Sequence, residues 1–88
     1  MIKTFKNKGL AALWEAGNSR IDKRMHRRIL IRLAVINEAT SVEDINLPGY
    51  NFHGFNPKRY TVHVNGPWCL TFEFEGGNVY QIDFEQYH

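Results

Sequence analysis

The chain is 88 residues long, with a hydrophobic fraction of 43%, a net charge of +2 and one cysteine, Cys69. These values exclude an intrinsically disordered chain and an internal disulfide, and they fit a single domain with one modest core over residues 1–88. Because no stretch approaches the roughly 18 apolar residues of a membrane span and no signal-peptide core is present, we expect a soluble cytoplasmic protein without membrane contact.

The N-terminal half predicts a short strand followed by two helices. Residues 2–5 alternate between apolar and polar side chains, which favours an edge strand. Residues 8–16 have the composition of a helix, which the following glycine ends. Ser19 and Asp22 have the spacing of a capping box for a second helix over residues 21–40. Its buried stripe is expected to consist of apolar residues at helical spacing: Met25, Ile29, Leu33 and Ile36.

The C-terminal half predicts an antiparallel meander that begins near residues 50–55. Between residues 60 and 88 the even-numbered positions are apolar and the odd-numbered positions mostly polar, so each class occupies one face of the sheet. Three-residue turns at 65–67 and 76–78 would preserve this parity. We therefore expect an α+β fold in which two N-terminal helices pack on a mainly antiparallel sheet of four to five strands.

The expected register places ionisable side chains together on the polar face. Three pairs are predicted to lie opposite each other: His63 with Cys69, Cys69 with Glu85, and Thr71 with Asp83. Tyr87 is predicted to lie diagonally beside Cys69. This row is a candidate site, and the alternative is the solvated face of an ordinary antiparallel sheet.

Positive charge is concentrated near the N-terminus. Residues 1–32 hold nine of the eleven Lys and Arg residues against two acids, whereas residues 33–88 hold two against seven. Most of these cations are predicted to lie on the outer face of the second helix: Arg20, Lys23, Arg24, Arg27, Arg28 and Arg32. Such a face favours an anionic partner, most commonly nucleic acid, although a solvated helix face is the simpler interpretation.

Several separated segments carry a family resemblance: "MIKTFKNKGLAALWEAG", "INLPGYNFH" and "VHVNGPWCLTFEFEGGNVYQIDFEQYH". With these segments and its length, the chain resembles HigB-type toxins of the RelE/ParE superfamily. The resemblance implies a RelE-like fold and a type II toxin that cleaves mRNA in the ribosomal A site without metal or cofactor. It also implies neutralisation by a HigA-like helix-turn-helix antitoxin, through which alone the toxin would meet operator DNA.

The resemblance also assigns site residues. His53 matches the histidine after the Leu-Pro-Gly turn, and Tyr87 and His88 match the terminal pair. The resemblance implies that His53 and Tyr87 transfer protons with support from His88. Lys58 and Arg59 would contact the phosphate. The basic residues Arg20, Lys23, Arg24, Arg27 and Arg28 would dock on ribosomal RNA.

Three positions depart from the family pattern. Asn56 replaces a lysine, Cys69 replaces an arginine and Gln86 replaces an acid. A thiol cannot form the paired hydrogen bonds that a guanidinium donates to phosphate, so Cys69 in particular predicts weaker catalysis. Together the three departures predict an attenuated enzyme.

Alternatives from other classes remain open. The chain could be a non-catalytic homologue that binds antitoxin or ribosome through its basic helix, or a ParE-like gyrase inhibitor. A thiol nucleophile at Cys69, beside His63 and Glu85, is a weaker possibility. Zinc binding by His53, His63, His88 and Cys69 lacks close-spaced ligand pairs, so we expect no metal site.

Overall fold

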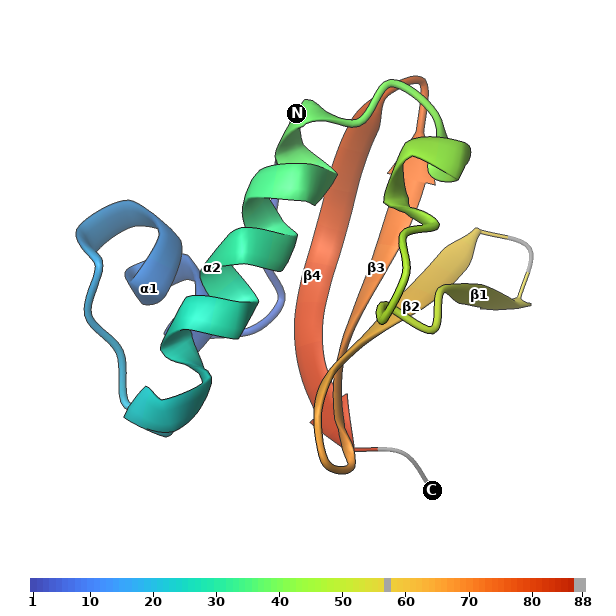
Figure 1. Cartoon of the computed structure of the whole chain (residues 1–88). Helices are drawn as coiled ribbons and strands as arrows, with labels where there is room; N and C mark the ends of the chain where they lie inside the picture. The colour runs from blue at the N-terminus through green and yellow to red at the C-terminus, as the bar shows by residue number, and fades with distance from the viewer. Residues whose placement is uncertain (57, 87–88) are drawn as a thin grey trace.

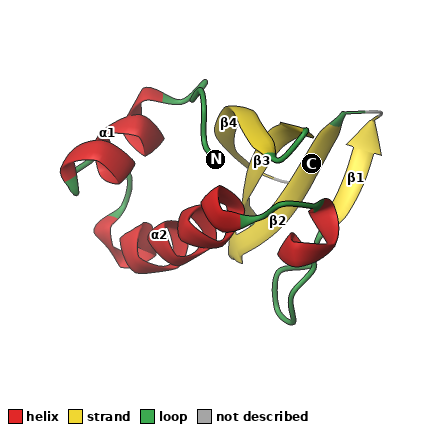
Figure 2. Ribbon diagram, turned by 90° about the horizontal axis from the view of Figure 1, so that it is seen from above, coloured by secondary structure: helices red, strands yellow, loops and turns green. Residues whose placement is uncertain are grey.

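A computed structural model describes residues 1–56 and 58–86 and shows the expected α+β fold (Figure 1). Two helices and a short 3₁₀ helix precede the strands: α1 (Lys8–Ala16), α2 (Lys23–Glu38), η1 (Val42–Ile45), β1 (His53–Asn56), β2 (Arg59–Asn65), β3 (Trp68–Glu75) and β4 (Asn78–Gln86). The strands form one antiparallel sheet in the order β1-β2-β3-β4. Both helices lie on one side of the sheet, and no helix of the described residues covers its other face (Figure 2). Within the described residues, no helix has the length and apolar character needed to span a membrane.

Helix α1 forms over the predicted residues because both of its ends are capped. The side chain of Asn7 accepts a hydrogen bond from the Leu10 N–H at 3.0 Å. Gly17 takes a left-handed conformation, with φ of 73°, and donates its N–H to the Leu13 carbonyl at 3.0 Å. The sequence therefore predicted this element correctly.

Helix α2 is shorter than predicted at both ends. Asp22 is its N-cap and accepts from the Arg24 N–H at 2.9 Å. Ser19, the predicted cap, instead accepts from the Ile21 N–H at 3.2 Å and stabilises the turn before the helix. The predicted start was wrong because Ser19 and Asp22 stand three positions apart and only one of them can cap the first turn of the helix.

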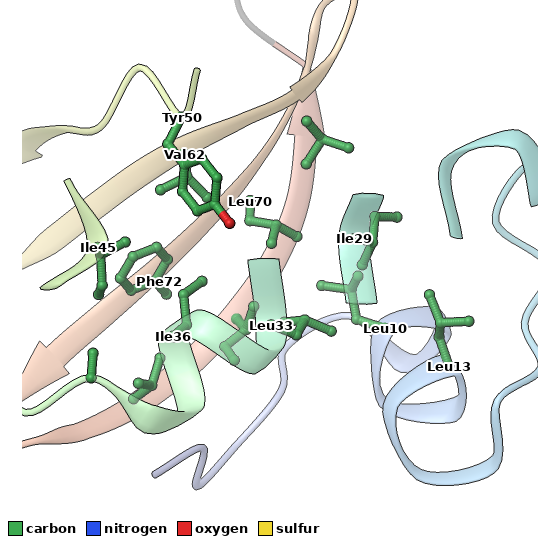
Figure 3. Close-up of a cluster of buried hydrophobic side chains, with 14 of the residues drawn as sticks. Leu10, Leu13, Ile29, Leu33, Ile36, Ile45, Tyr50, Val62, Leu70 and Phe72 are labelled. Atoms are coloured by element: carbon green, nitrogen blue, oxygen red, sulfur yellow. The ribbon is translucent and has the colours of Figure 1, made fainter. Parts of the chain in front are cut away.

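The core forms between α1, α2, η1 and the apolar face of the strands (Figure 3). Its fully buried side chains include Leu10, Leu13, Ile29, Leu33, Ile36, Ile45, Val62, Leu70, Phe72 and Ile82. All four residues of the predicted α2 stripe are buried. This packing fixes which face of the sheet is covered and therefore which face is available for chemistry.

The N-terminal residues lie beside β4, but they form isolated bridges instead of the predicted edge strand, and they run parallel to β4. Ile2 and Phe5 form isolated bridges with Val79 and Ile82. The Ile2 N–H also donates to the Asn37 side chain at 2.9 Å, which joins this segment to α2.

The β3–β4 turn differs from the prediction. It has two loop residues, Gly76 and Gly77, with φ of 59° and 79°, as a type I′ hairpin requires. A bulge at Gln81, with φ of 53°, then restores the predicted register further along β4. As a result, Tyr80 lies opposite Glu73 on the polar face, although the sequence placed it on the apolar one.

The β2–β3 turn is tighter than predicted in a similar way. His63 pairs with Cys69 as expected, but a register shift follows and Asn65 pairs with Trp68. The loop between those strands is therefore Gly66-Pro67.

Candidate active site

The open face of the sheet carries three polar rows that cross the strands. Strand pairing gives their members: His53, Thr61, Thr71 and Asp83 in one row; His63, Cys69 and Glu85 in the second; Arg59, Glu73 and Tyr80 in the third. The predicted pairs His63–Cys69, Cys69–Glu85 and Thr71–Asp83 are thereby confirmed. We refer to this surface as the polar face.

The centre of the polar face is buried. Thr61, Cys69 and Thr71 are only 3%, 3% and 4% exposed. The interpretation of this surface as an ordinary solvated sheet face is therefore wrong at its centre. Buried hydroxyl and thiol groups bounded by charged side chains form a polar environment in which electrostatic contacts are less screened by water.

Arg59 is the cation that reaches into this centre. Its Nη2 donates to Thr71 Oγ1 at 2.9 Å and lies 3.5 Å from the Gln81 carbonyl oxygen. Its Nη1 lies 3.4 Å from Glu73 Oε2, and the two side chains are 20% and 39% exposed. Thr71 Oγ1 also contacts the Glu85 carboxylate. The guanidinium is thus held over the polar face, where a phosphate group could meet it.

His53 stands at the start of β1 and shares a row with Thr61 and Thr71. Its side chain is exposed, and its Nδ1 lies 3.0 Å from the Asn51 carbonyl oxygen. When Nδ1 donates to that carbonyl, the neutral ring carries its basic lone pair on Nε2. Lys58 is exposed at the turn before β2. The fold therefore brings His53 and Arg59, predicted as separate site residues, to the same face of the sheet.

Cys69 does not have the environment of a nucleophile. Burial raises the pKa of its thiol, and the neighbouring Glu85 charge adds to that rise, while the Thr61 hydroxyl opposes it. Its Sγ donates to the Glu85 carbonyl oxygen at 3.4 Å. A protonated, buried thiol acts as a small apolar side chain, so the structure gives no support to thiol catalysis.

The described residues contain no group of three or more His, Cys, Asp or Glu side chains placed to hold a metal ion. His88, one of the four residues weighed as zinc ligands, lies outside the described residues.

The basic residues of α2 divide into two classes. Lys23 and Arg27 are exposed, as is Arg20 just before the helix. Arg24 is also exposed but pairs with Asp22 at 2.7 Å, which holds the pKa of the Asp22 carboxyl at about 2. These residues provide the predicted basic surface.

Two arginines further along α2 bind the sheet. Arg32 donates from Nε to the His63 carbonyl oxygen at 2.6 Å, and its guanidinium lies 4.5 Å from the centre of the Tyr50 ring. Arg28 donates from Nη1 to the Val64 carbonyl oxygen at 3.3 Å, although its side chain is exposed. The placement of Arg32 on the outer face was therefore wrong, because the residue lies at the contact between α2 and β2.

Comparison with known proteins decides the family. The profile of a family described as "RelE-like toxin of type II toxin-antitoxin system HigB" matches residues 3–88. The chain belongs to this family. A similar protein is endoribonuclease HigB of Proteus vulgaris, which is 36% identical in an alignment of 92 positions that covers the whole of both chains. Membership of a type II toxin family means that this toxin has an antitoxin as partner.

Two further expected site residues of the toxin, Tyr87 and His88, lie outside the described residues, so their predicted roles are untested. The expected position of Tyr87 beside Cys69 is likewise untested.

Sequence reasoning did not predict that Thr71 and Glu85 contact each other beneath Arg59. Parity placed Thr71 and Glu85 on the polar face, and it paired Thr71 with Asp83, as the structure does, which gave no reason to expect a contact with Glu85. In the structure, the Asp83 carboxylate accepts from the Phe84 N–H at 2.9 Å. The Glu85 side chain reaches Thr71 diagonally across the strands. The alternation of polar and apolar residues does not predict such a diagonal contact.

Proposed function

We propose that this toxin is an endoribonuclease that cleaves mRNA on the ribosome, using side chains of the polar face and neither metal nor cofactor. Support comes from family membership, from the name of the Proteus vulgaris relative, and from the placement of His53 and Arg59 on one face of the sheet.

The proposed reaction requires three chemical groups. A base removes the proton from the ribose 2′-hydroxyl, whose oxygen then attacks the adjacent phosphorus. An acid protonates the 5′-oxygen as its bond to phosphorus breaks, and a cation stabilises the charge that develops on the phosphate. This sequence gives a 2′,3′-cyclic phosphate and a 5′-hydroxyl end.

His53 and Arg59 match two of these needs. With Nδ1 directed at the Asn51 carbonyl, the His53 ring is oriented for proton transfer at Nε2. Arg59 offers a planar guanidinium that suits a phosphate. Lys58 adds a second, exposed cation next to Arg59 in the chain.

Tyr87 and His88 complete the proposal on the strength of the resemblance alone. We assign Tyr87 to proton transfer and His88 to support of the same step. The departures at Asn56, Cys69 and Gln86 suggest a slower enzyme than the family pattern would give, with Arg59 supplying the guanidinium that position 69 lacks.

The exposed basic residues of the second helix are proposed to bind ribosomal RNA. Phosphate contacts from Lys and Arg provide affinity without reading sequence, and such binding weakens as salt rises. The proposed residues are Arg20, Lys23, Arg24, Arg27 and Arg28. The antitoxin is proposed to be HigA-like with a helix-turn-helix, and operator DNA would be reached only through it.

The shared face of His53 and Arg59 carries the proposal, and their variants test it. We expect His53→Gln and Arg59→Ala each to lower ribosome-dependent mRNA cleavage about 10²-fold, in the range measured for a lost transition-state contact. Glu43→Gln, at an exposed position of the 3₁₀ helix, is the control and should cleave as the wild type does. Full activity of both site variants would contradict the site. Inhibition of gyrase without cleavage would support the ParE-like alternative instead.

A further inference from the structure

One hydrogen-bonded chain of side chains crosses the polar face diagonally. It begins at Arg59 on β2, passes through the Thr71 hydroxyl on β3 and ends at the Glu85 carboxylate on β4. Strand pairing places these residues in three different rows, so only the long side chains at either end bring the groups together.

The hydroxyl at the centre can satisfy both partners in only one arrangement. Threonine has one O–H donor and two acceptor lone pairs, an ionised carboxylate only accepts, and a guanidinium only donates. The Thr71 hydrogen must therefore point to Glu85, which leaves its lone pairs to accept from Arg59 Nη2. The ionised Glu85 thus fixes the direction in which Thr71 receives the guanidinium.

Burial shields the hydroxyl at the centre of this arrangement from water. Thr71 is 4% exposed, so water does not compete effectively for its hydroxyl, whereas Glu85 at the strand end is exposed. The Glu73 carboxylate lies on the other side of the guanidinium, 3.4 Å from Nη1. Arg59 is consequently held from two directions rather than extended into solvent.

We infer that Thr71 and Glu85 are positioning residues, which hold the Arg59 guanidinium in the orientation that binds the reacting phosphate. This inference rests on the proposed function. Neither residue touches substrate in this account, because both act through Arg59. The benefit is preorganisation: a cation already fixed where charge develops stabilises the transition state without reorganising during the reaction.

The test compares hydroxyl deletion with hydroxyl retention at one position. Thr71→Val keeps the shape and removes the hydroxyl, and we expect it to lower kcat for ribosome-dependent cleavage about tenfold while KM stays within about twofold. Thr71→Ser restores the hydroxyl and should recover most of the activity. Thr40→Val is the matched control: the Thr40 hydroxyl also donates to a carboxylate, that of Asp44 at 3.1 Å, but it lies between α2 and η1, outside the polar face. It should cleave as the wild type does.

A double-mutant cycle separates positioning from general stability. In an Arg59→Ala background, Thr71→Val should lower kcat less than about twofold further, because the group that Thr71 positions is gone. Glu85→Gln provides an exposed second site that does not endanger folding, and we expect a loss of about threefold that also vanishes in this background. Thermal denaturation of every variant accompanies the kinetics.

Three results would overturn the inference: wild-type activity of Thr71→Val, equal loss in Thr71→Val and Thr71→Ser, or an undiminished Thr71→Val effect without Arg59. Absence of cleavage by the wild type would reject the proposed function instead. Positioning would then be judged by rotation of the Arg59 guanidinium, measured by nuclear magnetic resonance on the free toxin. Faster rotation in Thr71→Val but not in Thr71→Ser would support it, and equal rotation in both would reject it.

Discussion

Two arginines on the same helix should respond in opposite ways to removal. Arg32 donates to the His63 carbonyl oxygen at 2.6 Å and lies over the Tyr50 ring, whereas Arg27 is exposed. A hydrogen bond from a charged donor contributes roughly 1.5–3 kcal/mol, and a cation–π contact roughly 0.5–2 kcal/mol. Desolvation opposes both, and it lowers the pKa of Arg32. We therefore expect Arg32→Ala to destabilise the toxin by about 2–3 kcal/mol, or roughly 10–20 °C in Tm for a domain of this size.

Arg27→Ala should change the free energy of unfolding by less than about 0.5 kcal/mol, because a surface cation contributes little to folding. It should instead weaken binding to ribosomes, because it removes a proposed phosphate contact. Chemical denaturation measures the first property, and co-sedimentation with ribosomes across a salt series measures the second. The Arg27 variant should also show a shallower salt dependence. The reasoning is refuted if Arg32→Ala is as stable as the wild type, or if Arg27→Ala destabilises the fold and binds ribosomes normally.

Three further changes have defined outcomes. Cys69→Ala should cost roughly 1 kcal/mol in denaturation experiments, as for a small buried group, yet leave cleavage within about twofold, and a large loss of cleavage would instead indicate a thiol step. Deletion of Tyr87 and His88 should abolish cleavage while ribosome binding in co-sedimentation persists, and a deleted form that still cleaves would place the proton transfer elsewhere. Hydrogen bonds from Arg24 lower the pKa of the Asp22 carboxyl from 3.8 to about 2 in the folded state. The ionised carboxylate therefore stabilises the fold fully above pH 3.8, and this stabilisation is lost as the pH falls toward 2. The difference in Tm between wild type and Asp22→Asn should therefore shrink over that interval, and a constant difference would show that the carboxylate charge is not responsible.

Sequence predicted the sheet well where burial of one face constrained it. A slip of one residue would turn Val62, Leu70 and Phe72 to the open face, so the alternation of apolar residues fixed the pairing of β2 with β3. The pairing of Cys69 with Glu85 followed from the same constraint.

Prediction failed where local backbone geometry changed the parity. The sequence offered three residues at 76–78 for an odd loop, but two glycines with positive φ suffice for the tighter turn. The extra residue was absorbed at Gln81, a residue type with no particular preference for positive φ. Composition alone did not locate this bulge, and Tyr80 was therefore assigned to the wrong face.

The sequence also failed to predict which partners two arginine side chains contact. Arg32 stands seven residues after Met25 and three after Ile29, so its spacing placed it beside the buried stripe, but its charge suggested the solvent side. Arg59 was predicted to contact phosphate, yet its support from Thr71 and Glu85 depends on side-chain reach across two strands. Patterns in a sequence record which face a residue occupies, but not which partners a long side chain reaches on that face.

The most direct test of the account is the chemistry of the cut. Purified toxin is incubated with ribosomes carrying a defined mRNA, and the ends of the cleaved fragments are identified for the wild type and for Arg59→Ala. Attack by the 2′-hydroxyl predicts a 2′,3′-cyclic phosphate and a 5′-hydroxyl, formed about 10²-fold more slowly by the variant. Fragments that carry a 5′-phosphate, or an Arg59→Ala variant as fast as the wild type, would contradict catalysis by the polar face.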